Sequence, residues 1–172
     1  MASKASIAGH PIHPMLVPIP IGLFVFALVA DCASRVEGAS AAWPEVALYC
    51  IGGGIVGALL AAPFGLIDLL SLDDERAKKV GITHMVINLT VVALFIINFI
   101  LRIQGAADTT PFILTLIGIG LLLVSGWLGG HMVYVLGVAQ AGPGERVAVE
   151  RRRVRTPVSN ERRHRDTPIG QH

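Results

Sequence analysis

Hydrophobic residues dominate four long runs of this chain, and short polar stretches separate one run from the next. A helix needs about 20 apolar residues to cross the hydrocarbon core of a bilayer, and these runs are of that order. Proline favours the first turn of a helix, so Pro44 and Pro111 mark the starts of the second and fourth spans. The predicted helices cover about 20–34, after a non-helical entry, then 43–72, 74–102 and 111–136. The pattern predicts an all-α protein, an integral membrane bundle of four transmembrane helices.

The composition agrees with a membrane domain. Of the 172 residues, 53% are hydrophobic and 15% are charged, which is too little charge to cover a soluble domain of this length. The first apolar run contains Pro18 and Pro20 and has no small-residue cleavage site. We therefore expect it to remain in the mature chain rather than to act as a signal peptide.

The character of the chain changes near residue 139. We assign residues 1–139 to the transmembrane domain, with its His-Pro-rich entry, and residues 140–172 to a polar, basic tail. The arginine-rich segments RRRVR and ERRHR predict a disordered, solvated end or a tail that binds anionic lipid headgroups or an acidic partner. No nucleic-acid partner is expected.

Lysine and arginine positions predict the orientation in the membrane. Four spans place both termini on one side, and the basic residues of that side are Lys4, Arg76, Lys78, Lys79 and the tail arginines. The other side keeps only Arg35 and Arg102. The positive-inside rule therefore predicts a multi-pass protein of the bacterial inner membrane with cytoplasmic termini.

Small residues predict where the helices pack. Gly53, Gly57 and Ala61 follow one another at four-residue spacing in the second span, and Gly126 and Gly130 do so in the fourth. No convincing repeat relates the two halves of the chain. Cys32 and Cys50 have no metal-type spacing, so they are expected to be small buried hydrophobic residues or, alternatively, a disulfide across the first two spans.

Two histidines stand at the entry to the first span, in the segment HPIHPMLVPIP. A residue before proline is disfavoured in helical conformation, so His10 and His13 are expected in an extended or polyproline-like segment. Such a segment has three residues per turn and would hold both imidazoles on one side. We expect it to lie over the mouth of the bundle and to direct both rings towards His84.

The third span carries a polar stripe through an apolar helix. At 3.6 residues per turn, His84, Asn88, Asn98 and Arg102 share one face, which should point into the bundle because polar groups are costly in lipid. Other polar residues near the same membrane depth as His84 are Asp68 in the second span and His131 in the fourth, where His131 shares a face with Trp127 and Tyr134. Asp31 and Arg35, four residues apart, predict a local ion pair.

The segments GHPIHPMLVPIPIGL, GLIDLLSL, THMVINL and GWLGGHMVYVLGV together resemble a bacterial family of four-span membrane proteins, domain of unknown function 2231. The resemblance covers about residues 9–139. Association of some members with Rieske-type iron–sulphur domains implies a link to electron transfer. His10, His13 and His84 match the family pattern, whereas the family often has another residue where this chain has His131.

Three functions follow from these residues. The first is binding of haem b or a transition metal for electron transfer, as an accessory subunit of a respiratory or other redox membrane complex. Its expected cofactor ligands are His10, His13, His84 and His131, and its expected non-haem metal ligands are His10, His13, His84 and Asp68. The second is a structural or accessory subunit without a cofactor. The third is a proton or ion path through Asp68, His84 and Asn98; the absence of hydrolase, zinc-protease and nucleotide-binding motifs favours no enzymatic activity.

Overall fold

The computed structural model describes residues 4–106 and 109–138, so the predicted tail at 140–172 lies outside the described residues. Its elements, in chain order, are β1 (Ser6–Ile7), β2 (His10–Pro11), α1 (Ile12–Leu16), α2 (Pro18–Ala33), α3 (Trp43–Leu70), α4 (Glu75–Ile103) and α5 (Thr109–Tyr134). Four helical segments are long and apolar enough to cross a membrane, with α1 and α2 together forming the first. The protein is an all-α integral membrane bundle of four transmembrane helices, as predicted.

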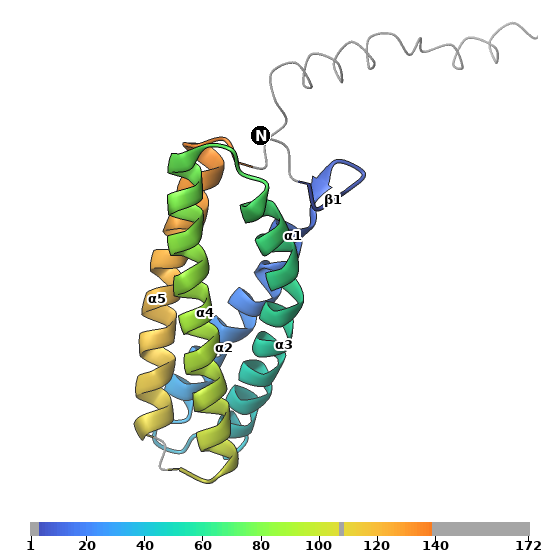
Figure 1. The fold of residues 1–172 in the computed structure, drawn as a ribbon. Helices are drawn as coiled ribbons and strands as arrows, with labels where there is room; N and C mark the ends of the chain where they lie inside the picture. The colour runs from blue at the N-terminus through green and yellow to red at the C-terminus, as the bar shows by residue number, and fades with distance from the viewer. Residues whose placement is uncertain (1–3, 107–108, 139–172) are drawn as a thin grey trace, which may run out of the picture. The chain divides into compact units, whose positions relative to one another are not determined.

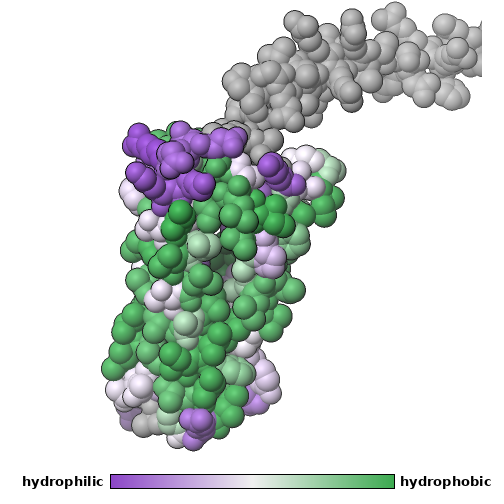
Figure 2. Space-filling view, viewed as in Figure 1, coloured by the Kyte–Doolittle hydropathy of each residue, from purple (hydrophilic) through white to green (hydrophobic). Residues whose placement is uncertain are grey.

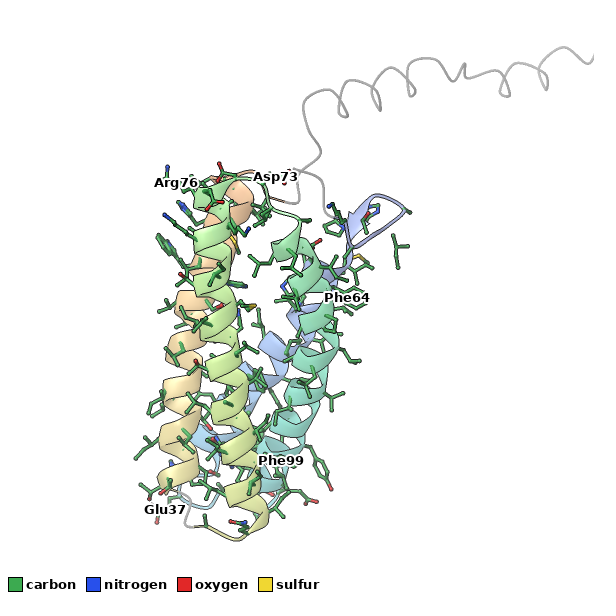
Figure 3. The ribbon with its side chains drawn as sticks, viewed as in Figure 1. Glu37, Phe64, Asp73, Arg76 and Phe99 are labelled. Atoms are coloured by element: carbon green, nitrogen blue, oxygen red, sulfur yellow. The ribbon has the colours of Figure 1, made fainter. Side chains whose placement is uncertain are left out.

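Polar and apolar surfaces are arranged as a membrane requires. Figure 2 shows a hydrophobic belt around the middle of the bundle and hydrophilic residues at its two ends. Asp73 and Arg76 lie at one end and Glu37 lies at the other (Figure 3). Large apolar side chains of the belt, including Leu60, Leu89 and Leu123, are exposed on the bundle surface, where they meet lipid.

The helices pair into two antiparallel hairpins (Figure 1). The first hairpin comprises α1, α2 and α3, and the second comprises α4 and α5. In α3, Gly53 and Gly57 lie against α2, where Leu23 and Pro20 occupy the space that a Cβ would take. This contact confirms the predicted packing role of the glycines in the second span.

Two aromatic rings join the hairpins at the centre of the core. Phe24 of α2 and Phe95 of α4 stack with their centroids 3.9 Å apart and their planes 2° from parallel. Each ring lies on a glycine of its own hairpin, because a Cβ on Gly54 would come within 2.5 Å of Phe24 and one on Gly118 within 2.8 Å of Phe95. Ala27, Ile51 and Val91 complete the buried cluster.

The entry segment is extended at His10, as predicted, but differs from the prediction at His13. His10 belongs to β2, which pairs with β1 through a tight turn at Ala8 and Gly9, both with positive φ (51° and 80°). His13 lies in helix α1 rather than in a polyproline-like segment. The prediction was wrong because proline is tolerated in the first turn of a helix, where its missing N–H has no partner to lose. A single break at Val17, before Pro18, separates α1 from α2.

The glycines of the fourth span also differ from the prediction. A Cβ on Gly126 or Gly130 would meet no atom within 4 Å, so this pair makes no close helix contact within the described residues. The glycines of α5 that face other side chains are Gly118, beneath Phe95, and Gly129, beside His84. Cys32 is exposed rather than buried, Cys50 is half-buried, and both are free thiols.

Candidate functional site

His84 projects from α4 towards α5 and is half-buried. Its Nδ1 lies 2.9 Å from the backbone carbonyl oxygen of Ser125, and its Nε2 lies 3.0 Å from the Asn88 amide nitrogen. The ring edge passes beside Gly129, where a Cβ would lie 3.3 Å from Cε1. The imidazole is therefore oriented by the backbone of α5 and by the next turn of its own helix.

Asn88 has more acceptors within reach than it can serve. Its amide nitrogen lies 3.0 Å from His84 Nε2, 2.9 Å from the His84 carbonyl oxygen and 2.7 Å from Ser125 Oγ. An amide nitrogen carries two hydrogens. Asn88 can thus leave Nε2 of His84 and still donate both hydrogens, which makes that nitrogen available to another group.

His13 makes the same two kinds of contact in the first hairpin, with a backbone carbonyl and with a glycine. Its Nδ1 lies 3.0 Å from the carbonyl oxygen of Ala61 in α3, and the ring lies over Gly65. A Cβ on Gly65 would come within 2.8 Å of Cε1, so only glycine leaves room for the ring in this position. His13 is half-buried, like His84.

The hydrogen-bond partners define the neutral tautomer of both rings. A carbonyl oxygen only accepts, so Nδ1 carries the proton in His13 and in His84, and the lone pair lies on Nε2. The structure therefore orients two predicted site residues, from opposite hairpins, in the same way. Nε2 is the remaining ligand atom of each ring, and in His84 it lies 3.0 Å from the Asn88 amide nitrogen.

The other predicted site residues lie elsewhere. His10 is exposed and its Nδ1 lies 3.1 Å from the carbonyl oxygen of Ala8 in the same turn. Asp68 accepts a hydrogen bond from the backbone nitrogen of Ala5 at 3.3 Å, which fastens the N-terminal segment to α3. His131 stacks on Trp127 with centroids 5.6 Å apart, on the face that carries the exposed ring of Trp127. Within residues 4–106 and 109–138, no group of three or more His, Cys, Asp or Glu side chains is placed to hold a metal ion.

Apolar contacts lie on both sides of the histidine level along the bundle. The Phe24–Phe95 stack lies on one side, deeper in the bundle. On the other side, Leu69 of α3 reaches α4, since its Cδ1 lies 2.6 Å from the Cβ position of Gly81, with Met132 of α5 beside it. The largest fully buried apolar side chains all lie at the level of Val91 or deeper. At the histidine level, His13, His84 and Asn88 are half-buried and Ser125 is buried.

A second polar network closes the opposite end of the bundle. The Asp31 carboxylate accepts two hydrogen bonds from Nη2 of Arg102, at 2.7 and 2.8 Å, and one from Oγ1 of Thr115 at 2.9 Å. Asn98 accepts from Arg102 at 2.7 Å and donates to Thr115 and to the carbonyl of Pro111, both at 2.9 Å. We call this the ion-pair end, and the end that carries His13 and His84 the histidine end.

The ion-pair end corrects one prediction. Arg35, the predicted partner of the Asp31 carboxylate, donates instead to the backbone carbonyl oxygen of Asp31 at 2.6 Å and stacks over the ring of Phe112. The carboxylate is bound by Arg102, 71 residues away in the chain. A pair four residues apart on a helix surface stays accessible to water, whereas Arg102 can reach Asp31 inside the bundle and replace its lost hydration.

Some residues of the site were not identified from the sequence. These are the carbonyls of Ala61 and Ser125, which orient the histidines, and Gly65 and Gly129, which make room for them. Backbone carbonyl partners cannot be identified from a sequence because every residue has a carbonyl. The two glycines are visible in the sequence, and each stands four residues after the residue whose carbonyl the histidine contacts.

Comparison with known proteins agrees with this fold. Residues 9–142 match the model of a family described as predicted membrane protein, DUF2231. No curated protein and no solved structure matches the chain. The match includes His10, His13, His84 and His131 as well as all four transmembrane segments.

Proposed function

We propose that this chain, which belongs to the DUF2231 family of predicted membrane proteins, binds haem or a transition metal between its two hairpins. The proposed ligands are His13 and His84, and the proposed role is that of an accessory electron-transfer subunit in a membrane redox complex. One observation carries the proposal: two imidazoles from opposite hairpins each donate Nδ1–H to a backbone carbonyl, so that Nε2 is the atom of each ring that could bind a metal.

This arrangement has a known chemical use. Histidines that bind a metal almost always donate their other ring N–H to a carbonyl or carboxylate, which holds the ring in one tautomer and one orientation. A histidine that only makes one interhelical hydrogen bond does not need a partner for its second ring nitrogen. The same arrangement occurring at His13 and at His84 supports a shared ligand rather than two unrelated contacts.

The donor set favours haem over a lone metal ion. A protein site for zinc, copper or non-haem iron uses three or four protein ligands, and the described residues bring no third His, Cys, Asp or Glu to the pair. Haem needs at most two axial protein ligands because the porphyrin supplies the other four nitrogens. When bound, haem would supply one-electron chemistry, while the chain would hold the iron and keep the site away from bulk water.

The charges of the ends support an orientation. Lys4, Arg76, Lys78 and Lys79 belong to the histidine end, and Arg35 and Arg102 to the ion-pair end. We infer that the histidine end faces the cytoplasm of a bacterium and that the protein resides in the inner membrane. A redox partner would then reach the site from the cytoplasmic half of the bilayer.

A visible spectrum tests the proposal. The full-length protein, purified in mild detergent, should show a Soret band that shifts on addition of dithionite, or should contain metal in stoichiometric amount. The His13→Ala and His84→Ala variants should each show an altered Soret band or a reduced cofactor content, whereas His10→Ala and His131→Ala should resemble the wild type. A wild-type protein without a Soret band and without bound metal, also after incubation with haemin, would refute the proposal.

A structural role without a cofactor is the second candidate. The contacts of His84 with Asn88 and Ser125 satisfy the ring without any ligand, which favours this reading. In that case His84→Leu should leave assembly intact and the spectrum featureless, and the wild-type protein should co-purify with a membrane complex. Cofactor in the wild-type protein that depends on His84 would exclude this role as the sole function.

A further inference from the structure

The two hairpins repeat one pattern of contacts. Phe24 lies over Gly54 in the first hairpin, and Phe95 lies over Gly118 in the second. The two phenylalanines are 71 positions apart in the sequence (24 to 95), and the two glycines are 64 positions apart (54 to 118). Each contact joins the first long helix of a hairpin to the second, so the two contacts are equivalent in topology as well as in residue type.

The histidine contacts follow the same two spacings. His13 and His84 are 71 positions apart (13 to 84). Their carbonyl partners in Ala61 and Ser125 are 64 positions apart (61 to 125), and so are the glycines beside the rings, Gly65 and Gly129 (65 to 129). The described part of the chain therefore repeats one pattern of contacts in its two hairpins, a relation that the sequence analysis did not predict.

Two pairs of equivalent residues meet directly. Phe24 stacks on Phe95, and Asp31 pairs with Arg102, again 71 positions apart. A residue can touch its own equivalent only close to the axis that relates the two copies. Seven residues separate the two contacts along each helix, about 10 Å of rise, so this pseudo-two-fold axis runs along the bundle.

The axis places His13 and His84 opposite each other. Both histidines stand 11 residues before the stacked phenylalanine of their own helix segment, although the first is interrupted near Val17 and the second is continuous. The rings therefore lie at similar depth on the two sides of the axis. Each offers Nε2 from an equivalent half-site of carbonyl, glycine and imidazole.

We propose that these half-sites hold one iron porphyrin on the pseudo-two-fold axis, with His13 bound to one face and His84 to the other. This inference rests on the proposed function and makes it specific, because a porphyrin is planar and presents the same metal to both faces. The Phe24–Phe95 stack would form one border of the site and Leu69 with Met132 the other. Gly65 and Gly129 are positioning residues that leave room for the two rings.

Spin state tests this geometry in the full-length protein loaded with haemin. The wild-type complex should be six-coordinate and low-spin by electron paramagnetic resonance and magnetic circular dichroism. His13→Ala and His84→Ala should each become five-coordinate and high-spin, and free imidazole should restore the low-spin signal in both. Imidazole rescue separates loss of a ligand from loss of the fold.

The glycines supply matched variants. Gly65→Ala should weaken haem retention by about 10- to 100-fold, the range seen when the groups that orient a metal ligand are changed. Gly129→Ala should act in the same direction but less, because its Cβ would lie 3.3 Å from the His84 ring rather than 2.8 Å from the His13 ring. Gly126→Ala, where a Cβ meets nothing within 4 Å, should retain haem like the wild type.

The outcomes separate the two proposals. Haem that is high-spin in the wild type, or that depends on only one of the two histidines, would overturn the two-sided geometry while leaving cofactor binding intact. Bound metal without haem would do the same. Neither haem nor metal in any preparation would overturn the proposed function itself.

A measurement without ligand tests whether the half-sites face each other. In a chain carrying Cys32→Ala and Cys50→Ala, a short bifunctional maleimide should link His13→Cys to His84→Cys within one chain. Replacing His10 and His84 by cysteine should give little cross-linking, because His10 is exposed in the β1–β2 turn. Equal cross-linking of both pairs, or none of the first, would contradict the axial placement.

Discussion

The ion-pair end and the histidine end both carry a polar network between α4 and the rest of the bundle, but they differ in how their donors and acceptors balance. At the ion-pair end, Asp31, Asn98 and Thr115 are fully buried, and their hydrogen bonds join α2, α4 and α5. At the histidine end, His84 and Asn88 are half-buried, and a single amide nitrogen faces three acceptors.

The difference separates stability from binding. A buried charge is costly unless its partner and the surrounding hydrogen bonds replace water, and Asp31 has all of these from its own chain. Nothing further needs to bind there. At the histidine end, each Nδ1 is bound to a backbone carbonyl, and the proposed function assigns the two Nε2 atoms to a ligand from outside the chain.

The largest effect is expected from breaking the ion pair. Arg102→Leu leaves the Asp31 carboxylate buried without its cation, which should lower the free energy of unfolding by about 3–5 kcal/mol. Helical circular dichroism during titration with sodium dodecyl sulphate measures the loss. The double variant Asp31→Leu with Arg102→Leu should recover most of the stability. A double variant as unstable as the single one would show that the network is not a clamp of paired charges.

The next effect concerns the glycines beneath the stacked rings. Gly54→Ala and Gly118→Ala place a Cβ within 2.5 and 2.8 Å of Phe24 and Phe95, so overpacking should destabilise each variant by about 1–3 kcal/mol. The same titration measures both. Gly120→Ala is the control, because a Cβ there meets nothing within 4 Å and alanine favours helix. Loss in only one of the two variants would argue against equivalent hairpins.

The histidine end should contribute less to stability. His84→Leu and Asn88→Leu remove interhelical hydrogen bonds that average about 0.6 kcal/mol in membrane proteins, so the free energy of unfolding without ligand should fall by less than about 2 kcal/mol. Differential unfolding in the presence and absence of haemin completes the measurement, since ligand should stabilise the wild type and not His84→Leu. A loss as large as that of Arg102→Leu would make the histidine end structural.

The smallest effect is expected on the outer face of α5. His131→Ala removes the stack on exposed Trp127 and should change the free energy of unfolding by no more than about 0.5 kcal/mol, with no change in the cofactor spectrum. Loss of cofactor in this variant would place His131 in the site after all and would contradict the pairing of His13 with His84.

Much of the bundle could be predicted because hydrophobic length and proline placement are local signals. The helix from Trp43 begins where predicted, and Asp74 caps α4 through a 2.7 Å hydrogen bond from the Ala77 backbone nitrogen. The inward stripe of His84, Asn88 and Asn98 also follows from helical periodicity alone. The helical start at Ile12 was missed because the pre-proline preference is weak against the first turn of a helix, where proline fits.

The repeat could not be predicted from the sequence because the two copies share few identical residues. A histidine followed ten residues later by Leu-Phe occurs twice, at His13 with Leu23-Phe24 and at His84 with Leu94-Phe95, but the remaining positions diverge. In a membrane helix most lipid-facing positions accept any large apolar residue. The repeat is therefore visible in residue types only at the contacting histidines, phenylalanines and glycines, and elsewhere only in the arrangement of the helices.

The sequence by itself determined four membrane spans, the polar face of α4 and the candidate histidines, because hydropathy and helical period act within one segment. Only the tertiary structure decided which partners those residues have. It paired Asp31 with Arg102 rather than Arg35, stacked His131 on exposed Trp127, and bound His13 and His84 to backbone carbonyls of α3 and α5. Such pairings depend on the distances between helices, which cannot be predicted from the spacing of residues along a single helix.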